Sequence, residues 1–213
     1  MRSTSPIPGN PWPHDMAITV EDRPHTLLEL LWVREAHGLR IEGDDDLPPM
    51  LTDTPGPAAP VDEATRARWQ ETWPRVWRAA AAHAGRDDTA ELMGRLQTTA
   101  NGSPERLALL QELVGPSWRD EFGDDAFDDD SYREWRDHGD ERHRSGIGHR
   151  LVDSPEHRDL ADLIAAWQAG LTKIVTIPCV GEFQRRLSPT AMLMTATTRA
   201  DSAAYRRALQ AFA

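Results

Sequence analysis

The sequence lacks several features that would place it in a familiar class of protein. Its 213 residues include one cysteine, Cys179, which excludes an intramolecular disulfide and any metal site built from several thiolates. No stretch approaches the roughly 18 consecutive apolar residues of a membrane-spanning helix. The first residues contain no apolar run of the kind found in secretory signals. We therefore expect a cytoplasmic protein with no membrane partner.

Short motifs that identify a reaction are absent as well. The sequence contains no HExxH zinc motif, no GxSxG nucleophile turn and no GxxxxGK[ST] phosphate loop. Cys179 lies in the strand-like run IPCVGE, where no local histidine pattern marks it as a nucleophile. We interpret it as a buried structural cysteine.

Positive charge is scarce relative to negative charge. The formal net charge is −11, and Lys173 is the only lysine. A field of that sign repels nucleic acid and anionic lipid, and it favours the approach of basic proteins. We expect a protein partner, of basic character, and no nucleic acid.

Helical patterns fill most of the chain. Thr26 and Glu29 form a capping-box pattern before a helix over 26–37, and a proline-rich loop follows it to residue 60. The next helix covers 62–83, where Pro74 predicts a kink or a division into two helices. Cap and stop signals then predict a series of helices that start near Asp88, Ser103, Ser117, Ser131 and Ser154.

The C-terminal part changes to strand patterns. Residues 172–180, 182–187 and 190–198 are β-branched or alternating, and Asp201 caps a final helix. We predict an α+β fold that is predominantly helical, with a small C-terminal antiparallel β-meander. Residues 1–60 would form an irregular N-terminal arm with one helix (26–37) and the proline-rich loop, and residues 61–213 the main α+β domain.

Trp69, Trp73 and Trp77 are the most distinctive residues of the sequence. Their four-residue spacing places them on one stripe of a helix. Large aromatic residues at this spacing usually pack inward, so a helix–helix seam is the favoured interpretation. The alternative is an exposed aromatic surface that binds a partner.

An acidic run follows the middle of the chain. It contains Asp124, Asp125, Asp128, Asp129 and Asp130, without the ligand spacing of an EF-hand. We interpret these residues as a solvated acidic surface on which a basic partner would dock.

Histidines and carboxylates cluster in the run DHGDERHRSGIGH. His138, Glu141, His143 and His149 are residue types that bind a divalent transition metal. His138 and His143 are five residues apart, however, and Gly146 and Gly148 indicate a loop. A solvated polar loop is the favoured interpretation, and a metal site is the alternative.

These observations support three hypotheses of function. The first is a non-catalytic acidic protein-binding protein (immunity-, antitoxin- or adaptor-like) that docks a basic partner and needs no cofactor. The second is a metal-dependent enzyme that uses the cluster at 138–149. The third is a structural or assembly subunit that associates through the tryptophan stripe and the edge of the meander.

Overall fold

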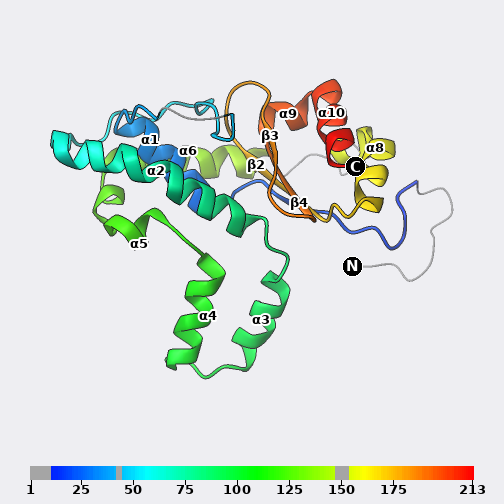
Figure 1. Cartoon of the computed structure of the whole chain (residues 1–213), viewed down its shortest axis with the longest axis horizontal. Coiled ribbons are helices and arrows are strands. Elements are labelled where there is room, and N and C mark those ends of the chain that lie inside the picture. Colours follow the sequence, from blue (N-terminus) through cyan, green and yellow to red (C-terminus); the bar gives the residue numbers. More distant parts are fainter. Residues whose placement is uncertain (1–10, 42–44, 147–153) are drawn as a thin grey trace.

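The computed structural model describes residues 11–41, 45–146 and 154–213, and helices predominate in it (Figure 1). The helices, including one 3₁₀ turn (η1), are α1 (His25–Ala36), α2 (Glu63–Ala84), α3 (Thr89–Thr98), α4 (Pro104–Val114), α5 (Trp118–Phe122), η1 (Asp125–Phe127), α6 (Asp130–Gly146), α7 (Pro155–Arg158), α8 (Leu160–Gln168), α9 (Ala196–Ala200) and α10 (Ser202–Phe212). The strands are β1 (Thr19–Glu21), β2 (Lys173–Ile177), β3 (Gln184–Arg186) and β4 (Ala191–Thr195). None of the described helices is both long enough and apolar enough to cross a bilayer.

The sheet is mostly parallel, so the predicted C-terminal antiparallel meander is wrong. Its strand order is β1-β2-β4-β3. β2 pairs in parallel with both β1 and β4, and β3 pairs with β4 in the antiparallel sense. Alternating sequence locates strands but does not specify their partners. Here β3 lies on the outer side of β4, which leaves β2 and β4 as direct neighbours, and β1 joins from the other end of the chain.

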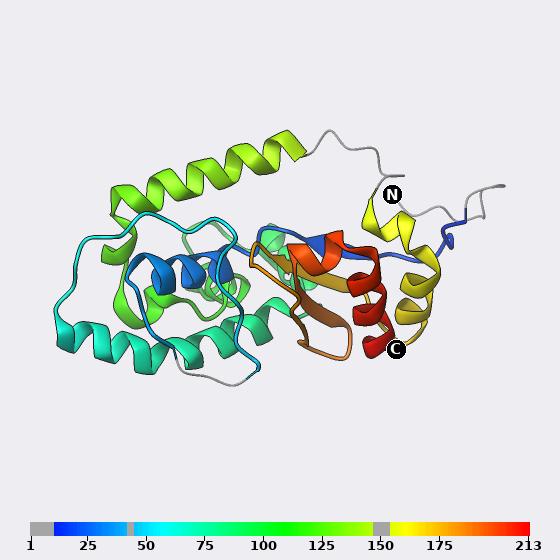
Figure 2. The same cartoon turned by 90° about the horizontal axis from the view of Figure 1, so that it is seen from above.

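Each face of the sheet covers a separate apolar core. Val175 and Ile177 of β2 belong to the core shared with α1 and α2. Ile174 of β2, with Met192 and Met194 of β4, faces the opposite core under α8 and α10 (Figure 2). A strand buried on both faces is a continuous apolar run rather than an alternating one. β1 and α1 thus contribute to a sheet and a core formed mainly by later residues, and the boundary predicted at residue 60 stays a prediction.

The tryptophan helix α2 is continuous through Pro74, so its division into two helices is wrong. The Asp62 side chain accepts a hydrogen bond from the Thr65 N–H, and Gly85 forms the C-cap. A helix that gains most of its stability from a buried face tolerates the one backbone bond that proline removes.

The capping box predicted for α1 does not form. The N-cap is Pro24, which makes no side-chain hydrogen bond to the helix. The Glu29 side chain is instead buried, where it pairs with Arg119 and accepts a hydrogen bond of 3.0 Å from the Tyr132 hydroxyl. The core contact outcompetes the local cap because a buried carboxylate must be fully hydrogen-bonded.

α6 extends through residues 136–146, where the sequence favoured a polar loop. Tyr132 anchors the start of the helix in the core shared with α1 and α2. Further along, three side chains make ion pairs with the N-terminal half of the chain, each of the small strength typical of exposed pairs. The pairs are Arg23–Asp140, Arg142–Asp53 and His143–Asp22. The single helix predicted from Ser154 is also divided, into α7 and α8, at Asp159.

α3 and α4 form a helical hairpin that projects from the body (Figure 1). Leu92 and Leu96 of α3 pack against Leu109 of α4 in a small core of their own, with Leu113 half-buried beside it. The hairpin therefore depends little on the two main cores for its internal packing.

Candidate functional site

The three tryptophans of α2 are buried. Trp73 and Trp77 are fully buried and stack with ring centroids 5.4 Å apart, and Trp69 is 7% exposed. Nε1 of Trp73 donates a hydrogen bond of 2.7 Å to the carbonyl oxygen of Leu30 in α1. This arrangement agrees with a helix–helix seam, and it leaves no exposed tryptophan surface for a partner.

The acidic run is largely engaged within the chain. Asp124, Asp129 and Asp130 have partners inside the protein, whereas Asp125 and Asp128 are exposed without an ion pair in the described part of the chain. The internal partners are Arg119 for Asp124, the N–H groups of Ala59 and Ser131 for Asp129, and Arg133 for Asp130. The run therefore ties the start of α6 to residues 56–60 and offers few free carboxylates to a partner.

Three of the four predicted metal ligands, His138, Glu141 and His143, lie on α6 and are not gathered into a site. His138 is exposed, and His143 faces Asp22 at 3.6 Å. A separation of five residues turns the helix by about 140°, so these two imidazoles point to different sides. No group of three or more His, Cys, Asp or Glu residues could hold a metal ion within 11–41, 45–146 and 154–213. His149 lies outside the described residues, and the metal site stays a prediction.

Cys179 is fully buried, and its backbone forms an isolated antiparallel β-bridge with Leu51. Burial raises the pKa of its thiol to about 12, against the lowering effect of Arg34. A protonated, inaccessible thiol is a poor nucleophile, so its position fits a structural role.

Two buried carboxylates act as structural junctions. Glu29 joins α1 to α5 and α6 through Arg119 and Tyr132, and burial raises the pKa of the Tyr132 hydroxyl to about 12, with Glu29 adding to the shift. Glu156 receives two hydrogen bonds from Arg199, at 2.7 and 2.8 Å. Burial alone would raise the pKa of Glu156, but Arg199 outweighs it and the pKa is lowered. Both pairs connect elements far apart in sequence.

The exposed apolar side chains gather on the α3–α4 hairpin. Four of the six large ones in the described residues are there: Met93 (44% exposed), Leu107 (59%), Leu110 (40%) and Val114 (58%). Three of these form one stripe along α4, because residues 107, 110 and 114 are separated by three and four positions. We refer to Leu107, Leu110 and Val114 as the α4 stripe.

A groove of about 530 Å³ runs beside the α4 stripe. Its other walls come from the end of α2 with the residues that follow it, and from α5, and they include His83, Arg86 and Asp120. Glu112 lines the groove from α4 itself. All three residues of the stripe line this groove. The apolar floor and polar rim match the general composition of a protein-binding surface.

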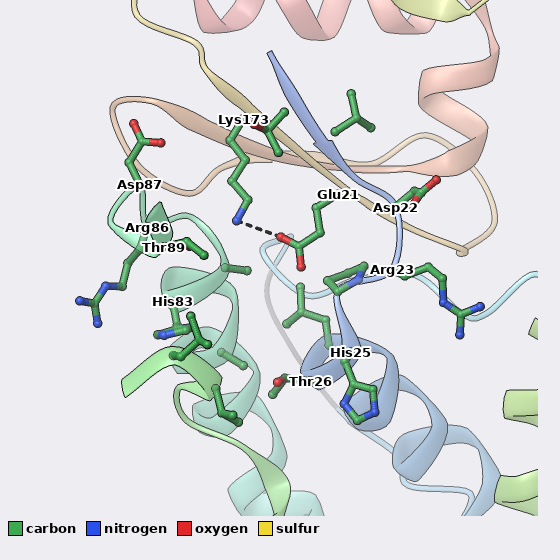
Figure 3. Close-up of a pocket in the computed structure, with 18 of the residues that line it drawn as sticks. Glu21, Asp22, Arg23, His25, Thr26, His83, Arg86, Asp87, Thr89 and Lys173 are labelled. Atoms are coloured by element: carbon green, nitrogen blue, oxygen red, sulfur yellow. Dashed lines mark ion pairs between the residues drawn. The ribbon is translucent and has the colours of Figure 1, made fainter. Parts of the chain in front are cut away.

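A larger cavity of about 900 Å³ adjoins the groove at Val114 and Pro116. β1, the start of α1, the end of α2 and α3 form its walls (Figure 3). Lys173 and Glu21 point toward each other from β2 and β1, with 2.9 Å between Nζ and Oε2. This pairing neutralises Lys173, so the cavity does not present it as an unpaired cation.

The base of the hairpin is fixed by a small set of polar contacts. Arg86 pairs with Asp88 and, at 3.1 Å, with Glu112, and these hydrogen bonds raise the pKa of Arg86. Nε2 of His83 lies 2.8 Å from the carbonyl oxygen of Glu112. Gly115 has φ +71°, and a Cβ there would meet the His83 ring at 2.3 Å. These contacts join the C-terminal part of α4 to the end of α2, beside the groove.

No protein-family model, curated protein or solved structure matches this chain.

The sequence carries a signal for this site in the leucine content of α4. α4 contains Leu107, Leu109, Leu110, Leu113 and Val114 in a helix of eleven residues. That is more than one face of such a helix can bury against a single neighbour. Leu109 packs against α3, and the apolar residues on the other face form the exposed α4 stripe.

Proposed function

We propose that this chain is a non-catalytic, cytoplasmic protein-binding protein, and that it docks a basic partner on the α3–α4 hairpin. The observation that carries the proposal is the concentration of exposed apolar side chains on one projecting hairpin beside a groove. Large apolar groups gathered in one exposed place are typical of interaction sites, whereas isolated ones are ordinary.

A partner that covers the α4 stripe would bury side chains that the fold leaves about half exposed. Fully burying a leucine or valine side chain contributes roughly 1.5–3 kcal/mol relative to full exposure. The stripe residues are between 40% and 59% exposed, so each retains about half of that gain for a partner. In most protein interfaces a few residues contribute most of the binding free energy, and these residues cluster at the centre of the contact.

The charge of the chain favours a basic partner. Its net charge of −11 raises the rate of encounter with a positively charged protein, in a manner that falls with salt. This effect acts over the whole surface and does not define where a partner binds. In this proposal the hairpin is the place of contact, and the net charge accounts for the preference for a basic partner.

The test compares two aspartate substitutions on the same helix. Leu107→Asp places a charge on the stripe, and Ala108→Asp places the same charge on an exposed position one residue away. Each tagged protein serves as bait in an extract of its own source, and retained proteins are quantified by mass spectrometry.

We expect a defined basic protein that the unmodified chain and Ala108→Asp retain and Leu107→Asp loses. Equal retention by all three baits would reject the hairpin as the docking site. The release of that protein by raised salt would support the electrostatic part of the proposal.

A further inference from the structure

The α4 stripe has the spacing that one helix offers to another. Its residues occupy an arc of about 60° of the helix circumference and span two turns. Leu109 and Leu113, which pack toward α3, lie on a separate face about 110° around the helix. α4 is therefore built to contact two neighbours, and the structure supplies one of them.

The rim of the groove is acidic. Among the described residues that line it, Arg86 is the one arginine, and its guanidinium is bound by Asp88 and Glu112. Asp120 adds a further carboxylate on the α5 side. Of the charged side chains that line the groove in the described structure, one is a guanidinium and two are carboxylates, so a ligand with positive charge beside its apolar face would complement the rim.

We infer that the occupant of this groove is an amphipathic helix of a partner, with lysine or arginine flanking its apolar stripe. The inference rests on the proposed function and goes further, because it specifies the partner's recognition element. Such a helix would lay apolar residues at i, i+3 and i+7 against Leu107, Leu110 and Val114, in helix-in-groove recognition. Its basic flanks would lie against Glu112 and Asp120.

The test uses synthetic peptides of about 14 residues, or four helical turns. One has leucines in a three–four repeat with lysine elsewhere, the second is a scrambled form of the same composition without the repeat, and the third replaces lysine with glutamate. Binding to the full chain is measured by fluorescence anisotropy at low and at physiological salt.

We expect the leucine–lysine repeat to bind at least tenfold more tightly than the scrambled and glutamate peptides. Leu107→Asp and Val114→Asp should each weaken it at least tenfold, and Ala108→Asp should not. Because all three positions are exposed, the variants should fold and keep the circular dichroism spectrum of the unmodified chain, with a melting temperature lowered by no more than the partial burial of Leu107 or Val114 supplies.

Electrostatic attraction without a defined site predicts a different pattern. Both lysine peptides would then bind equally, and the aspartate variants would bind them as well as or better than the unmodified chain, which overturns the inference. A dimer of this chain that Leu107→Asp dissociates, seen by analytical ultracentrifugation, would also overturn it, because the occupant would be a second copy.

The outcomes separate this inference from the proposed function. If Leu107→Asp removes a protein partner from the extract but no helical peptide binds, docking on the hairpin stands and the helical partner element is rejected. If the repeat peptide binds at the stripe but the extract yields no partner sensitive to Leu107→Asp, the groove accepts such a helix and the proposed function fails.

Discussion

Trp73 and Trp77 allow the value of one buried hydrogen bond to be measured within a single stacked pair. Both indoles are fully buried on α2, but Nε1 of Trp73 donates to Leu30 at 2.7 Å. Nε1 of Trp77 has no hydrogen-bond partner in the described part of the chain. Replacement by phenylalanine removes the same atoms from two fully buried sites and keeps an aromatic ring at each, so the hydrogen bond of Nε1 is the main difference between them.

The hydrogen-bond terms have opposite signs. Trp73→Phe loses a bond with a net value of about 1 kcal/mol, whereas Trp77→Phe removes an unpaired buried N–H that costs about 1–3 kcal/mol. We therefore expect Trp73→Phe to be more destabilising than Trp77→Phe by about 2–4 kcal/mol. Trp118, also fully buried with an unpaired Nε1, provides a control that should behave like Trp77.

Urea unfolding followed by circular dichroism at 222 nm gives the free energy of unfolding for each variant without relying on tryptophan fluorescence. Equal destabilisation at the two sites, or a larger loss for Trp77→Phe, would refute the argument from hydrogen-bond pairing.

Further predictions concern two glycines, a histidine and the cysteine. Gly115→Ala should lower the free energy of unfolding by at least about 1–3 kcal/mol, because φ is +71° and the added Cβ would also displace the His83 ring. Gly94→Ala, in open space within α3, should raise it by up to about 1 kcal/mol, and urea unfolding checks both. Burial lowers the pKa of His37, although Asp129 opposes the shift. The unfolded chain therefore binds the proton more readily, and stability that is present at neutral pH should fall as the pH drops below about 6.5. His37→Phe should flatten that part of the stability profile, and an unchanged slope would contradict the assignment. Cys179 should react with Ellman's reagent at pH 8 only after unfolding, since its thiol is buried with a pKa raised to about 12; rapid labelling of the folded chain would show otherwise.

Local cap signals in the sequence predicted the starts of several helices correctly. Ser103 caps α4, Ser117 and Asp120 form a capping box on α5, and Asp201 caps α10. These contacts join residues within three positions, so the sequence contains both partners. The failed capping box at Thr26 shows the limit, because Glu29 finds a stronger partner, Arg119, ninety positions away.

The candidate site was the harder inference. The sequence drew attention to tryptophan, aspartate and histidine, which are chemically conspicuous, and folding buried or paired many of them. The α4 stripe consists of ordinary aliphatic residues, and its exposure depends on α3 covering one face of α4 while nothing in the described structure covers the other. Residue type alone does not report which of two apolar faces is left uncovered.

By itself the sequence determined that this is a helix-rich, acidic chain with three tryptophans on one stripe of a helix, because helix periodicity, caps and net charge are local or additive properties. Tertiary structure decided the pairing of β1, β2 and β4, the length of α6 and the exposure of the α4 stripe. Each of these depends on contacts between residues distant in sequence. Such contacts form only where their combined burial and pairing outweigh the conformational entropy lost in bringing the segments together.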